Sequence, residues 1–262
     1  MLGSWVRVPA GSQKTTLFRV VFLFKSKKTS NDHVMEQQHI LNLINELEQV
    51  FSSNADIENG LAMSNYMKGR FPFFGINAPK RKELQRIWLQ KIPKDLSNND
   101  RWSIIEELWA KEEREFHHVA FDYLNSWNKK FMEPSDSEKL KWLISNNSWW
   151  DTVDSIASNY LGKFCLTFPI EGAELIKEWR QEDNFWLNRS CLIFQLKYGN
   201  KVDFELLKSL IFQFQPNKEF FIQKAIGWSL RQYSKFNPQA VADFVKEIDL
   251  KGLAKREATK YI

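Results

Sequence analysis

The chain has 262 residues, of which 43% are hydrophobic and 26% charged, so it can bury a sizeable core as one large domain or two small ones. Its two cysteines, Cys165 and Cys191, argue against a disulfide framework and favour a reducing compartment, which we expect to be the cytoplasm. No apolar run approaches the length of a membrane-spanning helix, and the best one near the start, LFRVVFLF, contains an arginine. A membrane partner is therefore not expected.

The net charge of +5 is distributed unevenly. Residues 1–34 contain six basic side chains and one acidic one, residues 35–184 carry a net charge of −6, and residues 185–262 carry +6. A polyanion responds to local potential, so the C-terminal stretch is a candidate binding surface. The ordinary explanation of such a bias is a solvated face without a partner.

Residues 1–34 lack a helical apolar period and differ in composition from residues 35–262. They could be a basic transit-like leader, a disordered arm that adds phosphate affinity, or an upstream extension of a protein that starts at Met35. We favour the last, an extension that is disordered and precedes one domain over residues 35–262, because a well-patterned helix begins at Met35. Its apolar positions recur at helical spacing: Ile40, Leu41, Ile44, Leu47 and Phe51.

The rest of the chain predicts helix after helix, and no run of alternating β-branched residues predicts a strand. The expected helical segments are 35–51, 77–91, 101–111, 112–127, 137–162, 169–181, 184–199, 202–214, 217–236 and 238–249. The expected breakers between them are Gly162, Pro169, Gly199, Pro216 and Pro238. In segment 77–91, Pro79 occupies a first-turn position, and Leu84, Ile87 and Trp88 share one face.

Helix pairs recur about every 35 to 40 residues, the period of HEAT and armadillo-type repeats. This favours an all-α fold of the α-solenoid type over a globular helical bundle. A solenoid is curved, and its concave face aligns residues that are far apart in sequence.

The stretch SWWDTVDS, residues 148–155, places aromatic rings and acids close together. On a helix, Trp150 and Asp154 lie on one face, one turn apart, while Trp149 points about 100° away. The inward stripe is expected to contain Trp149, Val153, Ile156 and Tyr160, which leaves Trp150, Asp154 and also Asp151 on a surface or cleft. The ordinary role of two such acids is a solvated face or a helix N-terminal charge.

Segment 184–199 carries Arg189 among apolar neighbours, where a partly buried arginine requires an anionic partner. That partner could be an intramolecular carboxylate such as Asp154 or Asp183, or it could be a phosphate.

Segment 217–236 has three cations and a tryptophan on one helical face, opposite the core-seeking side. Cations that bind phosphates beside a ring that packs on sugar or base are typical of a nucleic-acid contact. The four residues are Lys224, Trp228, Arg231 and Lys235. Gly227 permits close approach of another backbone, although it could serve helix packing alone.

Several mechanisms have no support in the sequence. The adjacent His117 and His118 have no acid or thiol at ligand spacing, so no metal site is expected. No P-loop, dinucleotide fingerprint or Gly-x-Ser-x-Gly motif is present, so no nucleotide cofactor is expected either.

Four stretches together resemble the AlkD family of DNA alkylation repair glycosylases. They are NYMKGRFPFFGINAPKRKEL, SWWDTVDSIAS, NFWLNRSCLIFQLKYG and NKEFFIQKAIGWSLRQYSKFNP, in this order and at these separations. The resemblance runs from about residue 36 to the C-terminus and does not cover residues 1–34. The chain departs from the family in its leader and in stopping soon after KREATKYI, where family members continue further.

The resemblance implies a solenoid of HEAT-like repeats whose concave basic face holds duplex DNA. It also implies excision of positively charged alkylated bases, chiefly N3-alkyladenine and N7-alkylguanine, without base flipping and without a metal or cofactor. The family's catalytic aspartate matches Asp154, its two lesion-framing tryptophans match Trp150 and Trp228, and its associated arginine matches Arg189. We expect four cations of the C-terminal stretch to contact the DNA backbone: Lys197, Lys224, Arg231 and Lys235.

Two other functions stay open at this point. A HEAT-repeat solenoid could be a non-catalytic DNA-binding or scaffold protein, or it could prefer branched DNA, because a fold alone does not dictate function. We expect a monomer that is located in the cytoplasm, at the nucleoid if the source is bacterial.

Overall fold

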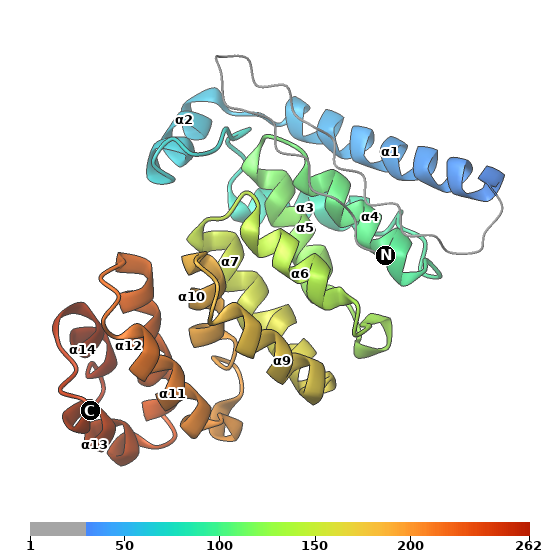
Figure 1. Ribbon diagram of the computed structural model, residues 1–262. Coiled ribbons are helices and arrows are strands. Elements are labelled where there is room, and N and C mark those ends of the chain that lie inside the picture. The colour runs from blue at the N-terminus through green and yellow to red at the C-terminus, as the bar shows by residue number, and fades with distance from the viewer. Residues whose placement is uncertain (1–29) are drawn as a thin grey trace, which may run out of the picture.

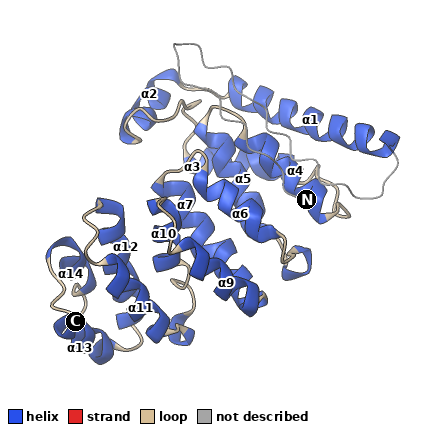
Figure 2. Ribbon diagram, in the orientation of Figure 1, coloured by secondary structure: helices blue, strands red, loops and turns tan. Residues whose placement is uncertain are grey.

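The computed structural model describes residues 30–262, with side chains from residue 37 onward, and all regular structure in this part of the chain is helical (Figure 2). The predicted all-α class is confirmed. The expected extension, residues 1–34, lies almost entirely outside the described residues, so that prediction stays untested. The first helix, α1 (Ser30–Ser53), begins five residues before Met35, the expected start.

The helices follow one another along the whole described chain. The N-terminal half contains α1, α2 (Ile57–Tyr66), α3 (Ala78–Leu89), α4 (Asn98–Trp109), α5 (Arg114–Ser126), η1 (Lys129–Phe131), α6 (Asp136–Ser145) and α7 (Trp150–Ile156). The C-terminal half contains η2 (Ala157–Leu161), α8 (Gly162–Thr167), α9 (Pro169–Trp179), α10 (Phe185–Ile193), η3 (Gly199–Lys201), α11 (Phe204–Phe214), α12 (Phe220–Ser234), α13 (Pro238–Glu247) and α14 (Gly252–Ala258).

Successive helices stack in chain order from α1 at one end to α14 at the other (Figure 1). Each helix packs mainly on near neighbours in sequence: α4 packs on α5, α5 on α7, α7 on α10, α10 on α12, and α12 on α14. This nearest-neighbour packing is that of an α-solenoid, as predicted. Both α2 and the α12–α14 group project on the same side of the stack, with α7 and α10 between them (Figure 1).

Local sequence explains where many helices begin. The side chain of Asp56 accepts the backbone N–H of Asn59 at the start of α2, and Ser97 forms a reciprocal capping box with Asp100 at the start of α4. Prolines occupy the first turns of α3, α9 and α13, where no backbone N–H is needed. Pro169 and Pro238 therefore act at helix boundaries, as predicted.

The expected helix over residues 137–162 is wrong in two respects. The chain leaves the helical path between α6 and α7, where Asn147 has a left-handed backbone with φ of 50°. At the other end Gly162 does not interrupt the chain, because helix continues from α7 through the π-helical η2 into α8. Gly162 instead permits close packing, since a Cβ there would lie 2.6 Å from the carbonyl oxygen of Phe194.

Two further expectations differ from the structure. The sequence pattern missed α2 and α14, which are short helices. In α3, Trp88 is buried and donates its indole N–H to the carbonyl of Leu43, but Ile87 is 53% exposed and does not share that core face.

Candidate active site

The first turn of α7 presents its two tryptophans in different directions. Trp149 precedes the helix with extended backbone and is buried, whereas Trp150 is half-buried at the first helical position. The predicted inward stripe is confirmed, because Val153 and Ile156 are fully buried and Trp149 is only 9% exposed. Asp154, one turn after Trp150, keeps part of its side chain at the surface.

Asp154 forms a bidentate ion pair with Arg189 of α10. The Arg189 Nε donates to Oδ1 at 2.7 Å, and Nη2 donates to Oδ2 at 2.7 Å. The Arg189 side chain is 5% exposed and the Asp154 side chain is 17% exposed. Of the partners considered for Arg189, the structure thus shows the carboxylate of Asp154, and this pair joins α7 to α10.

Arg189 also joins the site to α12. Its Nη1 donates to the carbonyl oxygen of Phe221 in the first turn of α12, the helix that carries Trp228. All three nitrogens of the guanidinium therefore have protein partners, and the group orients Asp154. Each Asp154 oxygen accepts one hydrogen bond from Arg189, so a second lone pair on each oxygen stays available.

Burial controls the acidity of Asp154. Its surroundings raise the pKa of the carboxyl above the ordinary value of 3.8, while the hydrogen bonds and charge of Arg189 oppose that rise. The charge of nearby Asp151 raises the pKa slightly further. A carboxyl with a raised pKa in a partly exposed position is typical of functional sites.

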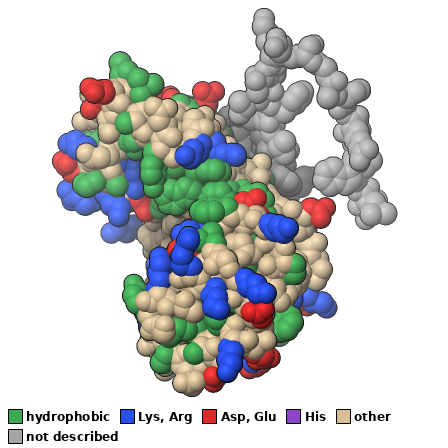
Figure 3. Space-filling model, turned by 90° about the vertical axis from the view of Figure 1, so that its left-hand side faces the viewer, with side chains coloured by type: hydrophobic (Ala, Val, Ile, Leu, Met, Phe, Trp, Pro, Cys, Tyr) green, Lys and Arg blue, Asp and Glu red, His purple; other side chains and the backbone are tan. Residues whose placement is uncertain are grey.

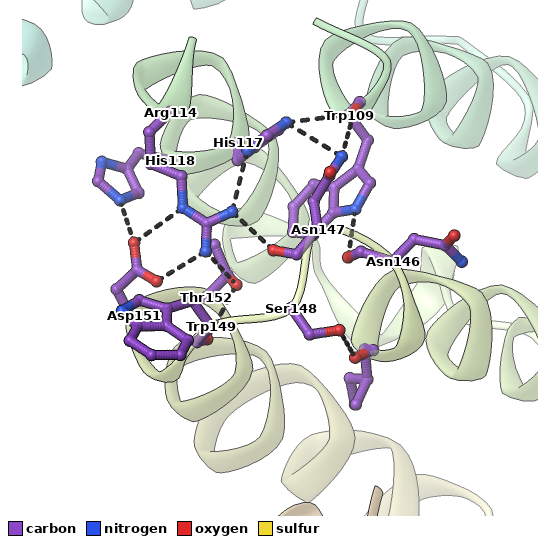
Figure 4. Close-up of polar contacts among 11 residues, drawn as sticks. Trp109, Arg114, His117, His118, Asn146, Asn147, Ser148, Trp149, Asp151 and Thr152 are labelled. Atoms are coloured by element: carbon purple, nitrogen blue, oxygen red, sulfur yellow. Dashed lines mark hydrogen bonds and ion pairs between the residues drawn. The ribbon is translucent and has the colours of Figure 1, made fainter. Parts of the chain in front are cut away.

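Asp151 does not lie on the open surface, contrary to the sequence expectation. Its side chain is 9% exposed and lies between Arg114, whose Nη2 donates to Oδ1 at 2.7 Å, and His118, whose Nε2 lies 2.8 Å from Oδ2 (Figure 4). Burial alone would raise the pKa of Asp151, but the hydrogen bonds from His118 and Arg114 outweigh it and hold that pKa well below its usual range. Asp151 is therefore a structural carboxylate in the first turn of α7.

Arg114 is the centre of this buried network, and its side chain is fully buried. It donates to the backbone carbonyl of Asn147 at 2.7 Å and to the hydroxyl of Thr152 at 2.9 Å, besides its pair with Asp151 (Figure 4). Its guanidinium also lies 3.8 Å from the ring centroid of Phe71. One side chain of α5 therefore fixes the turn before α7 and the first turn of α7 itself.

The two histidines that were considered as metal ligands have other contacts. His117 Nε2 lies 3.1 Å from the carbonyl of Trp109, and burial together with the charge of Arg114 lowers its pKa to about 3. His118 pairs with Asp151, and burial lowers its pKa as well. Within residues 37–262 no group of three metal-ligating side chains is present.

Trp150 has a neighbour that the sequence did not predict. The ring of Tyr66, at the end of α2, meets it edge to face with centroids 6.1 Å apart. Tyr66 itself is 69% exposed. Beside it, the exposed Arg70 lies over the Trp149 ring, 4.2 Å from the centroid. The end of α2 and the chain after it therefore border the surface around Trp150.

The predicted cationic face of α12 is present, but its charges are not all free. Trp228 is half-buried, as expected for a ring off the core face. Lys224 and Arg231 both pair with Glu257 of α14, at 3.0 and 2.5 Å. This acid was not foreseen from the sequence, because it is 26 to 33 residues away and no local spacing identifies it.

The remaining predicted cations, Lys235 and Lys197, are exposed. Lys235 donates to Gln232 at 2.9 Å, and Lys197 donates to the side chain of Asn159. Gly227, between the cations of α12, allows close helix packing: a Cβ there would lie 2.4 Å from the Cβ of Glu257. Figure 3 shows the side of the molecule toward which α2 and α12 project, with hydrophobic and basic side chains on two lobes around a narrower waist.

Among the helices that the structure describes, none has the length and apolar composition needed to cross a membrane. The sequence matches the family described as "DNA alkylation repair enzyme" over residues 47–262. A solved structure of a predicted DNA alkylation repair enzyme from Enterococcus faecalis is 36% identical, with a TM-score of 0.72, and the match covers 79% of this chain and 96% of that one. No curated protein matches the sequence.

Proposed function

The chain belongs to the DNA alkylation repair enzyme family, and from this premise we propose that it is a DNA glycosylase. Its proposed substrates are N3-alkyladenine and N7-alkylguanine in duplex DNA, which it releases by hydrolysis of the N-glycosidic bond. The observation that carries this proposal is the Asp154 carboxylate, which Arg189 holds by both oxygens at a partly exposed position one turn from Trp150.

This arrangement suits the charge that develops in the reaction. Breaking an N-glycosidic bond builds positive charge on the deoxyribose in an oxocarbenium-like transition state. A fixed carboxylate nearby stabilises that charge, and such electrostatic effects are often the largest in catalysis. Because Arg189 restrains both oxygens of Asp154, the carboxylate would need little reorientation during the reaction, and the free-energy cost of reorganising it would be small.

We propose that Asp154 also positions or deprotonates the attacking water. The lone pairs that Arg189 leaves unused are suitable acceptors for a water proton, and the exposed 17% of the side chain gives solvent access. The raised pKa of Asp154 makes it a better base than an ordinary aspartate.

Trp150 and Trp228 are proposed to flank the sugar with their electron-rich faces. A cation over an indole face gains roughly 0.5 to 2 kcal/mol. Both rings are half-buried, so each is anchored in the protein while part of it stays accessible. The Arg189 contact with Phe221 ties α12, and with it Trp228, to the helix pair that carries Asp154.

We propose that the damaged base stays stacked in the duplex, as the family resemblance implies. An alkylated, cationic purine is already a good leaving group, so selectivity would follow from its charge and lability. Neutral lesions should be poor substrates. The cations Lys197, Lys224, Arg231 and Lys235 are proposed to follow the DNA backbone, as positioning contacts without base readout.

The test is release of 7-methylguanine from duplex DNA that was treated with a methylating agent. Asp154→Asn should lower the excision rate about 10²-fold or more while DNA binding is kept. Asp122→Asn is a matched control, because Asp122 also pairs with a buried arginine, Arg81, at 2.9 Å. Wild-type protein that binds DNA normally but releases no base would establish the non-catalytic alternative, and a strong preference for junction DNA would point to branched structures.

A further inference from the structure

A buried carboxylate of α14 lies beneath the basic side chains of α12. The Glu257 side chain is only 7% exposed, and it pairs with Lys224 Nζ at 3.0 Å, Arg231 Nη1 at 2.5 Å and Lys260 Nζ at 2.9 Å. The three cations are more exposed, at 38%, 23% and 46% respectively. The acid is therefore inside and the cations face outward.

The close packing of α12 on α14 fixes the acid in this place. Gly227 lies between Lys224 and Arg231 on α12, and a Cβ at Gly227 would come within 2.4 Å of the Glu257 Cβ and 2.8 Å of the Ala254 carbonyl oxygen. Only glycine allows this approach without a shift of α14. The position of Glu257 relative to the α12 cations is thus set by backbone packing and not by flexible side chains.

The charges of this cluster do not cancel. One carboxylate needs one cation, yet three cations share Glu257, and among the described residues none of the three pairs with another acid. The cluster therefore carries a net charge of about +2. Most of its donors are also unused, because each lysine ammonium has three N–H donors and a guanidinium has five.

We infer that Lys224, Arg231 and Lys260 form a single phosphate-binding site that is organised by Glu257, and that its ligand is a phosphodiester of the DNA backbone. The shared carboxylate gathers three cations around one point, which suits the two oxygens of a phosphodiester and its single negative charge. Lys260 becomes a DNA contact that the sequence pattern did not identify. This inference rests on the proposed function, because it takes DNA as the ligand.

The experiment measures binding of the full chain to an undamaged duplex over a range of salt concentrations. Each phosphate contact contributes about 0.9 to the slope of log affinity against log salt concentration. Lys260→Ala removes one of the three cations that share this phosphate, so it should lower the slope by up to about one, which reduces the affinity change between 50 and 200 mM salt by up to about 3-fold. Lys260→Arg should keep the wild-type slope.

Lys246→Ala is the control, because Lys246 is an exposed lysine on α13 that has no part in the cluster. If Lys260→Ala and Lys246→Ala give the same slope as wild type, the phosphate site is wrong while the proposed function stands. If wild-type protein shows no salt-dependent binding to duplex DNA, both the site and the proposed function fail. Melting temperatures of the variants identify any effect that is due to misfolding.

Discussion

Arg114 binds both carboxylate oxygens of Asp151, at 2.7 and 3.0 Å, in a pair that is almost completely closed to solvent. Asp151 directly follows Trp150 and lies three residues before Asp154, so this pair fixes the turn of α7 from which the proposed catalytic residues project. The carboxylate of Asp151 and that of Asp154 thus have separate arginine partners, on α5 and α10.

Breaking the Arg114–Asp151 pair should harm both stability and catalysis. Arg114→Gln leaves a buried carboxylate with His118 alone, and removing one partner of a buried pair costs about 3 to 5 kcal/mol. A displacement of about 1 Å can cost up to 10²-fold in rate, so kcat should fall at least about 10-fold at a temperature where the variant is folded. Thermal unfolding and single-turnover excision measure the two effects.

Arg81→Gln provides a comparison for this variant. Arg81 is 4% exposed and its hydrogen bonds run to Gln85 and Asp122, not to residues of α7, so its loss should lower the melting temperature without lowering kcat. Equal kcat values for the two variants would show that Arg114 acts on stability alone.

The excision rate should depend on the ionisation of Asp154. The proposed mechanism needs the carboxylate, and its pKa is raised above 3.8 by burial, so activity is full above this raised pKa and is lost as pH falls through it. The acidic limb of the kcat profile should therefore lie at higher pH than for an ordinary aspartate. Arg189→Met removes the group that opposes the rise, so it should move the limb to still higher pH. If the acidic limb of the kcat profile lies at the same pH in Arg189→Met as in wild type, the ionisation of Asp154 does not control the excision rate.

The two tryptophans should contribute to rate more than to DNA binding. Loss of a cation–π contact of about 0.5 to 2 kcal/mol corresponds to about 2-fold to 30-fold in kcat for Trp150→Ala or Trp228→Ala. Trp142→Phe, at a half-buried tryptophan of α6, should leave kcat unchanged. Single-turnover excision and equilibrium DNA binding distinguish the two contributions, and a loss confined to binding would contradict the proposed role.

Glu257 should make folding stability depend on acid pH. Hydrogen bonds from Lys260 and Lys224 lower its pKa from 4.5 to about 2. A carboxyl with a lowered folded-state pKa stabilises the protein above its unfolded pKa, here 4.5, and loses this contribution as pH falls through about 2. The melting temperature of Glu257→Gln should therefore lie below that of wild type at neutral pH, and the difference should shrink below pH 4.5.

Glu205→Gln serves as a reference for this measurement, because Glu205 is 82% exposed in its pair with Lys208. Exposed pairs contribute little to stability, so this variant should follow the wild-type melting curve at every pH. If Glu257→Gln behaves in the same way, the buried carboxylate does not stabilise α14.

Much of the fold was predictable because local spacing determines it. Apolar residues at helical spacing and prolines in first turns gave most helices within a few residues. The helix break at Asn147 was not predictable in this way, because it depends on a carbonyl that accepts from Arg114, a side chain 33 residues earlier in the chain. Similarly, Gly162 is a breaker by composition, but in the structure it lies within continuous helix, where the missing Cβ leaves room for the carbonyl oxygen of Phe194.

In the candidate site, too, local spacing predicted some features, while contacts between residues distant in sequence determined the others. The helical period predicted that Trp149 faces inward and that Trp150 and Asp154 face outward. The apolar surroundings of Arg189 predicted an anionic partner, and of the carboxylate and the phosphate that were considered the structure shows the carboxylate of Asp154. The expected exposure of Asp151 was wrong and the pairing of Glu257 with the α12 cations was not foreseen, because a helical face does not reveal which residue of another helix covers it. The roles of Asp154, Trp150, Trp228 and Arg189 in catalysis stay predictions until the excision assays are done.

The unbroken helix from α7 through η2 to α8 has a consequence for how the protein meets its ligand. This continuous helix is bound to α10 and the residues after it at two separate points. Asp154 pairs with Arg189, and two turns later the Gly162 carbonyl accepts a hydrogen bond from the Tyr198 hydroxyl at 2.8 Å. Because both contacts hold the same continuous helix, the Asp154 carboxylate and the Arg189 guanidinium should not move relative to each other. The Asp154 carboxylate should therefore already have its catalytic position in the free protein. On binding, the DNA should change its conformation to fit the protein, and not the reverse.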